Sequence, residues 1–211
     1  MDEKERLLFL LKKQGMNFSK KVIKAFKAIP REKFVMENYK ERAYEDSPLP
    51  ILLGQTISQP STVLKFLDAL DVKLGNKVLE IGSGSGYNAA LLSKLVGTKG
   101  FIYSTEIAEP LAEFARNNIK KLKIKNVEIL RIDGSQGLME KEPFDRIILT
   151  AACSKIPDVL IDQLKTGGIL VAPVGPIYAQ NLVRLKKTSK RISEKILGQY
   201  QFVPMTGKYG Y

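Results

Sequence analysis

Residues 54–60, GQTISQP, bring together two hydroxyls, Thr56 and Ser58, and two amides without any charged side chain. A serine nucleophile needs a neighbouring base, and the chain contains no histidine. The local pattern therefore does not give a serine nucleophile. Serine is favoured at helix N-caps, so from these residues alone the favoured role of Ser58 is a simple cap of a helix that begins near Pro60.

A second chemical signal is the loop in VLEIGSGSGYNAALL, where glycines stand at positions 82, 84 and 86. The loop follows an apolar, strand-like run and opens a helical pattern, so it allows a ligand to approach the backbone closely. The dinucleotide fingerprint GxGxxG requires a glycine at position 87, where this chain has Tyr87. The pattern therefore disfavours a bound pyrophosphate.

Three acidic residues accompany this loop. Glu80 precedes it, and Glu106 ends the next strand-like run, where a carboxylate can accept both hydroxyls of a ribose. Capping of the helix at Ala108 is the structural alternative for Glu106. Asp133 and Gly134 follow the third strand-like run, where the adenine edge is expected, although Asp133 alone could be a turn residue. Together these residues favour a cationic adenosine ligand such as S-adenosylmethionine.

The single cysteine, Cys153, lies in TAACSKIP at the end of the fourth strand-like run. A cysteine nucleophile there would be typical of RNA cytosine-5 methylation, which is the alternative function. That chemistry requires an activated thiolate, and no acid or proline directly precedes Cys153. We therefore expect Cys153 to be a small buried residue. A third hypothesis, a non-enzymatic adenosine-ligand or RNA-binding module, would tolerate the loss of Ser58 and Thr56.

These residues need a scaffold, and the apolar pattern predicts an α/β fold. Strands are predicted over 77–81, 100–106, 126–132, 144–152 and 167–175, and helices over 59–70, 86–96, 108–122 and 157–164. The alternation predicts a doubly wound, Rossmann-like parallel sheet with helices on both faces. The remainder, residues 181–197, predicts a C-terminal antiparallel hairpin that turns at 188–190.

The N-terminal part of the chain has a different pattern. Two amphipathic helical stripes end at Pro30, and a third short helical stretch is predicted over about 31–43. We therefore predict a helical lobe over residues 1–50 that packs as one unit with an S-adenosylmethionine-binding domain over 51–211.

Composition limits the function classes. The 211 residues carry a net charge of +12, concentrated in KKLKIK (120–125) and RLKKTSKRISEK (184–195). Neither run alternates with aromatic residues, so we expect solvated surface rather than a nucleic-acid face. One cysteine excludes an intramolecular disulfide and a thiolate zinc site. We see no signal peptide and no apolar run of roughly 18 to 20 residues, so a cytoplasmic protein without membrane association is expected.

A resemblance to a known family rests on motifs that follow one another over nearly the whole chain. They are PREKFV (30–35), LPILLGQTISQP (49–60), the glycine loop, the Asp-Gly pair at 133–134, PFDRIILTAA (143–152), IPDVLIDQLKTGGILVAPVG (156–175) and FVPMT (202–206). The chain resembles the protein-L-isoaspartate (D-aspartate) O-methyltransferase family. The resemblance implies a class I S-adenosylmethionine-dependent methyltransferase fold with an N-terminal helical extension.

The resemblance also implies an activity. A methyl group would pass from S-adenosylmethionine, leaving S-adenosylhomocysteine, to the free α-carboxyl of L-isoaspartyl and D-aspartyl residues. The partners would be damaged proteins and peptides, whose repair this step initiates. No nucleic acid or metal is expected to be required, and a monomer is expected. Cys153 departs from the pattern, because relatives commonly have alanine or proline there.

Carried over by position, the resemblance assigns roles to individual residues. The active-site hydroxyl falls on Ser58 with Thr56 beside it, and the peptide substrate is expected along Val203, Pro204 and Met205. The implied cofactor contacts are Leu53, Gly54, Gly82, Ser83, Gly84, Glu106, Ile107, Asp133, Gly134 and Thr206.

The implied reaction agrees with a chain that lacks histidine. A carboxyl group with an ordinary pKa near 4 is already an anionic nucleophile at pH 7, and the sulfonium is already a good leaving group. Positioning alone can then supply up to roughly 7 to 11 kcal/mol of the barrier. The helix start near Gln59 and Pro60 is expected to add a mild anion site through its exposed N–H groups.

Overall fold

The structure, a computed structural model, describes residues 2–211 and is built on a seven-stranded sheet with the order β5-β4-β3-β6-β7-β8-β9. The strands are β3 (Lys77–Ile81), β4 (Phe101–Glu106), β5 (Val127–Arg131), β6 (Phe144–Leu149), β7 (Leu164–Val174), β8 (Gln180–Lys187) and β9 (Ile192–Tyr200). Strands β3 to β7 run parallel, and β8 and β9 are antiparallel. The predicted parallel sheet and C-terminal hairpin are confirmed.

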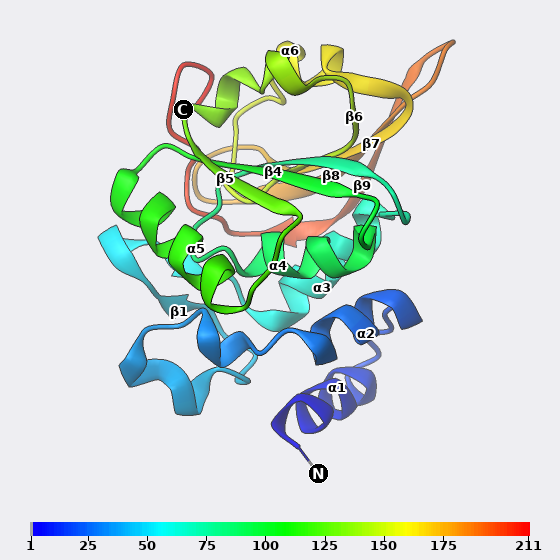
Figure 1. Cartoon of the computed structure of the whole chain (residues 1–211). Helices are drawn as coiled ribbons and strands as arrows, with labels where there is room; N and C mark the ends of the chain where they lie inside the picture. The colour runs from blue at the N-terminus through cyan, green and yellow to red at the C-terminus, as the bar shows by residue number, and fades with distance from the viewer. Residues whose placement is uncertain (1) are drawn as a thin grey trace.

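Helices cover both faces of the sheet, as its apolar strands require. Helices α3 (Pro60–Leu70), α4 (Tyr87–Val96) and α5 (Glu109–Lys121) lie on one face, and α6 (Asp158–Asp162) lies on the other (Figure 1). Within β3, the neighbours Val78 and Leu79 are both fully buried and belong to two different core clusters. Because successive side chains of a strand point to opposite faces, continuous apolar strands need cover on both sides.

Two strand boundaries differ from the sequence prediction by more than one residue. The predicted strand 144–152 ends at Leu149, where the chain bends and the Thr150 hydroxyl donates to the carbonyl groups of Ile81 and Gly82. The predicted strand 167–175 begins earlier, at Leu164, because an irregularity in the β6–β7 register brings Leu164 opposite Phe144. The connections after β5 contain only short 3-10 turns, η4 (Gly134–Gln136) and η5 (Met139–Lys141).

The N-terminal lobe lies below α3 and α4 in Figure 1, drawn in blue, and contains α1 (Glu3–Lys13) and α2 (Lys20–Ala28). The predicted helix over 31–43 is instead two 3-10 segments, η1 (Arg31–Lys33) and η2 (Glu37–Arg42). A continuous helix does not form because the backbone becomes extended at Met36, between the two segments, with φ of −66° and ψ of 152°. No helix within residues 2–211 is long and apolar enough to cross a membrane.

A small hairpin joins the lobe to the sheet and was not predicted. Strand β1 (Leu49–Pro50) pairs with β2 (Thr56–Ile57) across the 3-10 turn η3 (Leu52–Gly54). At this turn Leu53 has a φ of 56° and Gly54 a φ of 69°. The hairpin spans the proposed boundary at residue 50, and one apolar cluster includes side chains from both sides of it. The division into 1–50 and 51–211 stays a prediction.

Candidate active site

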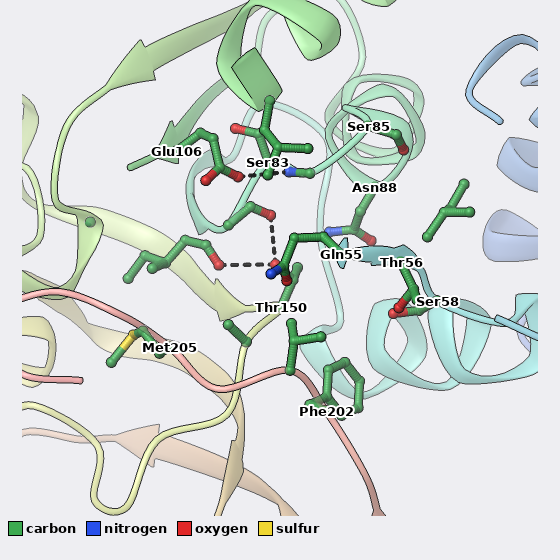
Figure 2. A pocket seen from close by; sticks show the side chains of 18 of the residues that line it. Gln55, Thr56, Ser58, Ser83, Ser85, Asn88, Glu106, Thr150, Phe202 and Met205 are labelled. Atoms are coloured by element: carbon green, nitrogen blue, oxygen red, sulfur yellow. Dashed lines mark hydrogen bonds between the residues drawn. The ribbon is translucent and has the colours of Figure 1, made fainter. Parts of the chain in front are cut away.

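A pocket opens where the carboxyl ends of β3, β4 and β6 meet (Figure 2). Its lining comes from the β1–β2 hairpin, the start of α3, the glycine loop, the end of β4, η4, the end of β6 and residues 202–206. Strand β3 lies between β4 and β6. The chain adds β4 and β5 on one side of β3 and then crosses to add β6 and β7 on the other side. Such a topological switch point opens a crevice in α/β sheets, which explains why the site is here.

The glycine loop connects β3 to α4 in a left-handed backbone conformation, with φ of 97° at Gly82 and 82° at Gly86. A Cβ atom at Gly86 would lie 3.3 Å from the backbone of Ala115 in α5, and one at Gly82 would lie 2.4 Å from the Thr150 hydroxyl. Both the backbone conformation and the close packing therefore require glycine. The strand-loop-helix prediction for GSGSG is confirmed.

A buried polar network supports the loop from below. Asn88 donates to one carboxylate oxygen of Glu80 at 2.7 Å, and the Ser104 hydroxyl donates to the other. The hydroxyl of Ser83 lies 2.6 Å from that of Ser104. Desolvation, partly offset by the hydrogen bonds from Ser104 and Asn88, raises the pKa of Glu80 to about 7. Glu80 thus holds the loop in place, whereas the sequence suggested that its charge suits a cationic ligand.

Glu106 makes a backbone contact at the start of α5, the structural alternative that its sequence position suggested, and it also faces the pocket. One carboxylate oxygen accepts the amide of Ala108 at 3.2 Å, and the other accepts the amide of Gly84 at 3.0 Å. The carboxylate also lines the pocket, where its oxygens retain acceptor capacity (Figure 2). A pair of neighbouring hydroxyls, such as those of a ribose, could donate to it. The pocket therefore fits an adenosine group at this end.

The hydroxyl groups of Thr56 and Ser58 lie on the opposite side of the pocket from Glu106 (Figure 2). The N-cap of α3 is Gln59, so the prediction that Ser58 is the cap is wrong. The first available amide of α3, that of Ser61, donates to a carboxylate oxygen of Asp46 at 2.8 Å. Because Pro60 has no N–H and Asp46 binds the Ser61 amide, this helix start is a weaker anion site than expected.

The segment 202–205 is held firmly beside the end of β6. The Ala152 amide donates to the Val203 carbonyl at 2.8 Å, and the Met205 amide donates to the Ala152 carbonyl at 2.7 Å. The Phe202 amide donates to the side chain of Gln180 at 2.8 Å. The predicted substrate residues therefore lie on a fixed, extended stretch at the pocket.

Most residues that the sequence assigned to the site line this one pocket. They are Leu53, Thr56, Ser58, Gly82, Ser83, Gly84, Glu106, Ile107, Gly134, Val203, Pro204, Met205 and Thr206. Gly54 and Asp133 lie outside the lining, at the hairpin turn and beside η4. The individual roles of all these residues stay predictions.

Other lining residues were not anticipated. They include Gln55, Asn88, Thr150 and Phe202 (Figure 2). Gln55 is part of the GQTISQP stretch, so its amide could have been included from the same reasoning. Phe202 packs on Phe66 of α3 with 4.9 Å between ring centres, a contact between distant segments that the sequence alone does not indicate.

Cys153 is fully buried and lies outside the pocket lining. Its thiol is near the Pro173 carbonyl, with 3.8 Å between sulfur and oxygen, and burial raises its pKa to about 12. A thiol with such a pKa is not a nucleophile at neutral pH. The expectation of a small buried residue is confirmed, and the RNA cytosine-5 alternative is not favoured. Residues 2–211 also contain no cluster of three or more His, Cys, Asp or Glu side chains arranged to hold a metal ion.

Comparison with known proteins gives a consistent result over the full length. The model of the family "Protein-L-isoaspartate(D-aspartate) O-methyltransferase (PCMT)" matches residues 2–210. A protein-L-isoaspartate O-methyltransferase from Methanosarcina mazei is 48% identical over 99% of this chain and 86% of its own length. One from Pyrococcus horikoshii is 43% identical over 100% of this chain and 99% of its own length.

Solved structures agree with the sequence relatives. A protein-L-isoaspartate O-methyltransferase with 34% identity has a TM-score of 0.88 and covers 98% of this chain and 67% of its own. A structure from Plasmodium falciparum, in complex with S-adenosyl-L-homocysteine, has 27% identity and a TM-score of 0.84 and covers 98% and 99%. The resemblance and the class I fold are confirmed. The chain is an S-adenosylmethionine-dependent methyltransferase and belongs to the protein-L-isoaspartate(D-aspartate) O-methyltransferase family.

Proposed function

We propose that this protein methylates the free α-carboxyl group of L-isoaspartyl and D-aspartyl residues in damaged proteins and peptides, using S-adenosylmethionine. The observation that carries the proposal is the layout of one pocket. The Glu106 carboxylate, suited to a ribose, lies on one side, and the uncharged hydroxyls of Thr56 and Ser58 lie on the other. Family membership of the whole chain supports the same reaction.

The cofactor, when bound, supplies an electrophilic methyl group on a sulfonium. Glu106 would accept the ribose hydroxyls, while Ile107 and the Gly82–Gly84 backbone would contact the rest of the adenosine and its amino acid tail. Leu53, Gly134 and Thr206 complete the proposed contacts. Val63, Phe66 and Ile148 add apolar surface to the pocket, which helps to exclude water from the reacting groups.

Thr56 and Ser58 would orient the acceptor carboxylate. Neither hydroxyl hydrogen-bonds to another residue within 2–211, so both are available to donate. Neutral donors hold the carboxylate without the strong ground-state stabilisation that a bidentate arginine would give. The substrate already carries the nucleophile in its ionised form, so this chain needs no general base.

The peptide backbone around the acceptor would lie along Val203, Pro204 and Met205. The hydrogen bonds between Ala152 and this segment keep it extended, which suits the alignment of a second extended chain. We further propose that the protein works in the cytoplasm, as a monomer and without nucleic acid.

A methyl-transfer assay with three acceptors tests the proposal. The protein is incubated with labelled S-adenosylmethionine and an isoaspartyl peptide, the same peptide with a normal aspartyl residue, or RNA. We expect base-labile methyl incorporation into the isoaspartyl peptide only. Equal labelling of the aspartyl peptide, or labelling of RNA, would contradict the proposed substrate.

A further inference from the structure

The last residues of the chain, 207–211, form a tail that folds back onto the loop after β5. The Lys208 amide donates to a carboxylate oxygen of Asp133 at 2.8 Å, and the Tyr209 amide donates to the Ser135 hydroxyl at 3.1 Å. At the far end, the Tyr211 amide donates to the Met205 carbonyl at 3.2 Å, and the Tyr211 hydroxyl donates to the Gly175 carbonyl at 2.6 Å. The tail is thus bound at both ends.

The carboxylate of Asp133 is fully used by these internal contacts. One oxygen accepts the amide and the hydroxyl of Ser135, at 3.0 and 2.7 Å. The other accepts the side chain of Gln136 at 3.2 Å and the Lys208 amide at 2.8 Å. Two carboxylate oxygens offer about four acceptor sites, so these four donors leave little capacity for a ligand.

Packing between the tail and Asp133 is also tight. Gly207 has a φ of +120°, and a Cβ atom there would lie 2.2 Å from a carboxylate oxygen of Asp133. The backbone at Gly207 therefore lies too close to the Asp133 carboxylate for a residue with a side chain. Asp133 and the tail are built as one unit.

This unit adjoins the pocket. Gly134 and Ser135, which follow Asp133, line it, and so do Met205 and Thr206, which precede the tail. We propose that Asp133 is a positioning residue: it holds residues 207–211 against η4 and thereby fixes the adenine end of the cofactor site. The inference rests on the proposed placement of the adenosine, and it replaces a direct contact between Asp133 and the cofactor.

A matched pair of variants at Lys208 tests this without altering Asp133. Lys208→Pro removes the amide that donates to Asp133, whereas Lys208→Ala keeps it. We expect the dissociation constant of S-adenosylhomocysteine, measured by calorimetry, to rise about tenfold in Lys208→Pro, which corresponds to about 1.4 kcal/mol. It should stay at the wild-type value in Lys208→Ala. At saturating cofactor, kcat should be unchanged in both variants, and the KM for S-adenosylmethionine should increase only in Lys208→Pro.

Hydrogen exchange shows whether the tail is released. The amides of Tyr209 and Tyr211 should be protected in the wild type and in Lys208→Ala, and should exchange faster in Lys208→Pro. A released tail with unchanged cofactor affinity would overturn the proposal, and so would a tail that stays protected in Lys208→Pro. Equal weakening by both substitutions would assign the effect to the lysine side chain and would also overturn it.

Asp133→Asn separates anchoring from direct contact. If Asp133 acts through the tail, Asp133→Asn and Lys208→Pro should weaken cofactor binding to a similar extent, and the double variant should be no weaker than either. If Asp133 binds the cofactor directly, Asp133→Asn should weaken binding while Lys208→Pro does not, which would refute the proposal. The calorimetry and hydrogen exchange do not use the methyl acceptor, so their results can be separated from a failure of the proposed peptide substrate.

Discussion

Asp46, from the lobe, binds the first available amide of α3 and leaves the hydroxyl of Ser58 free to face the pocket. Ser58→Ala should therefore remove a donor to the acceptor carboxylate without loosening the helix. A hydrogen bond to a charged group contributes roughly 1.5 to 3 kcal/mol, so kcat/KM for the isoaspartyl peptide should fall about 10- to 150-fold.

The control for Ser58→Ala is the affinity for S-adenosylhomocysteine, which calorimetry should find unchanged. Thr56→Val removes the second hydroxyl, in β2, with little change in side-chain volume, and it should also lower kcat/KM. Full activity of Ser58→Ala, or an equal loss of cofactor affinity, would show that Ser58 does not orient the substrate.

Cys153→Ala should leave methylation of the isoaspartyl peptide within about twofold of wild type, or about 0.4 kcal/mol. The thiol is buried outside the pocket, and its pKa of about 12 keeps it protonated. The same steady-state assay measures the variant. A loss of activity without a matching loss of thermal stability would give Cys153 a chemical role and revive the cytosine-5 hypothesis.

For single residues, the sequence predicted which side chains belong to the site better than it predicted their hydrogen-bond partners. Ser58 and Glu106 could be placed because each follows from a local pattern beside a predicted helix or strand. Asp46 could not be assigned to the start of α3, because it lies fifteen residues away along the chain. Glu80 could not be assigned to the network beneath the loop for a similar reason: one of its partners, Ser104, belongs to the adjacent strand β4.

The elements β3, β4 and α4 meet at Glu80, which gives this junction a pH dependence. The pKa of Glu80 rises from 4.5 to about 7 on folding, so the folded state binds its proton more tightly than the unfolded state does. The stabilisation is complete below about pH 4.5 and is lost as the pH rises through about 7. The full difference is on the order of 3 kcal/mol.

Thermal unfolding of wild type and Glu80→Gln across pH 4.5 to 7.5 measures this effect. The wild type should lose several degrees relative to the variant as the pH rises, because a glutamine keeps the hydrogen-bonding positions but does not titrate. Parallel curves for the two proteins would show that Glu80 has the same pKa in the folded and unfolded states.

The parallel strands and their helices could be predicted because their apolar periods are long and regular. The β1–β2 hairpin could not, because each of its strands has only two residues and its turn depends on the left-handed conformation of Leu53, which no local rule predicts. The 3-10 segments near residues 31–42 also escaped prediction. Their apolar residues have to reach a core formed by distant parts of the chain.

The whole molecule carries a net charge of +12, although the pocket lining contains no lysine or arginine among its described residues. Positive surface charge attracts acidic polypeptides over distances comparable to the Debye length. An isoaspartyl peptide flanked by Asp and Glu should therefore have a higher kcat/KM at low ionic strength than one flanked by Ser and Gly.

Initial rates for these two peptides, measured between low and physiological salt, check the charge effect. The advantage of the acidic peptide should shrink as salt increases, and it should appear in KM rather than in kcat. If the ratio between the peptides does not change with salt, the basic residues act as solvated surface only.

Among the residues that the structure describes, the pocket lining contains one acidic side chain, Glu106, and no lysine or arginine. Burial raises the pKa of Tyr87, which also lines the pocket. Methyl transfer from a sulfonium to a carboxylate begins with a positive and a negative reacting group and ends with a neutral thioether and a neutral ester. Reactions that cancel charge proceed faster as the polarity of their surroundings falls, because the separated charges lose more solvation than the dispersed charge of the transition state. A lining whose side chains, apart from Glu106, are uncharged is therefore a favourable medium for this reaction, and it exerts little electrostatic attraction on the neutral thioether and ester.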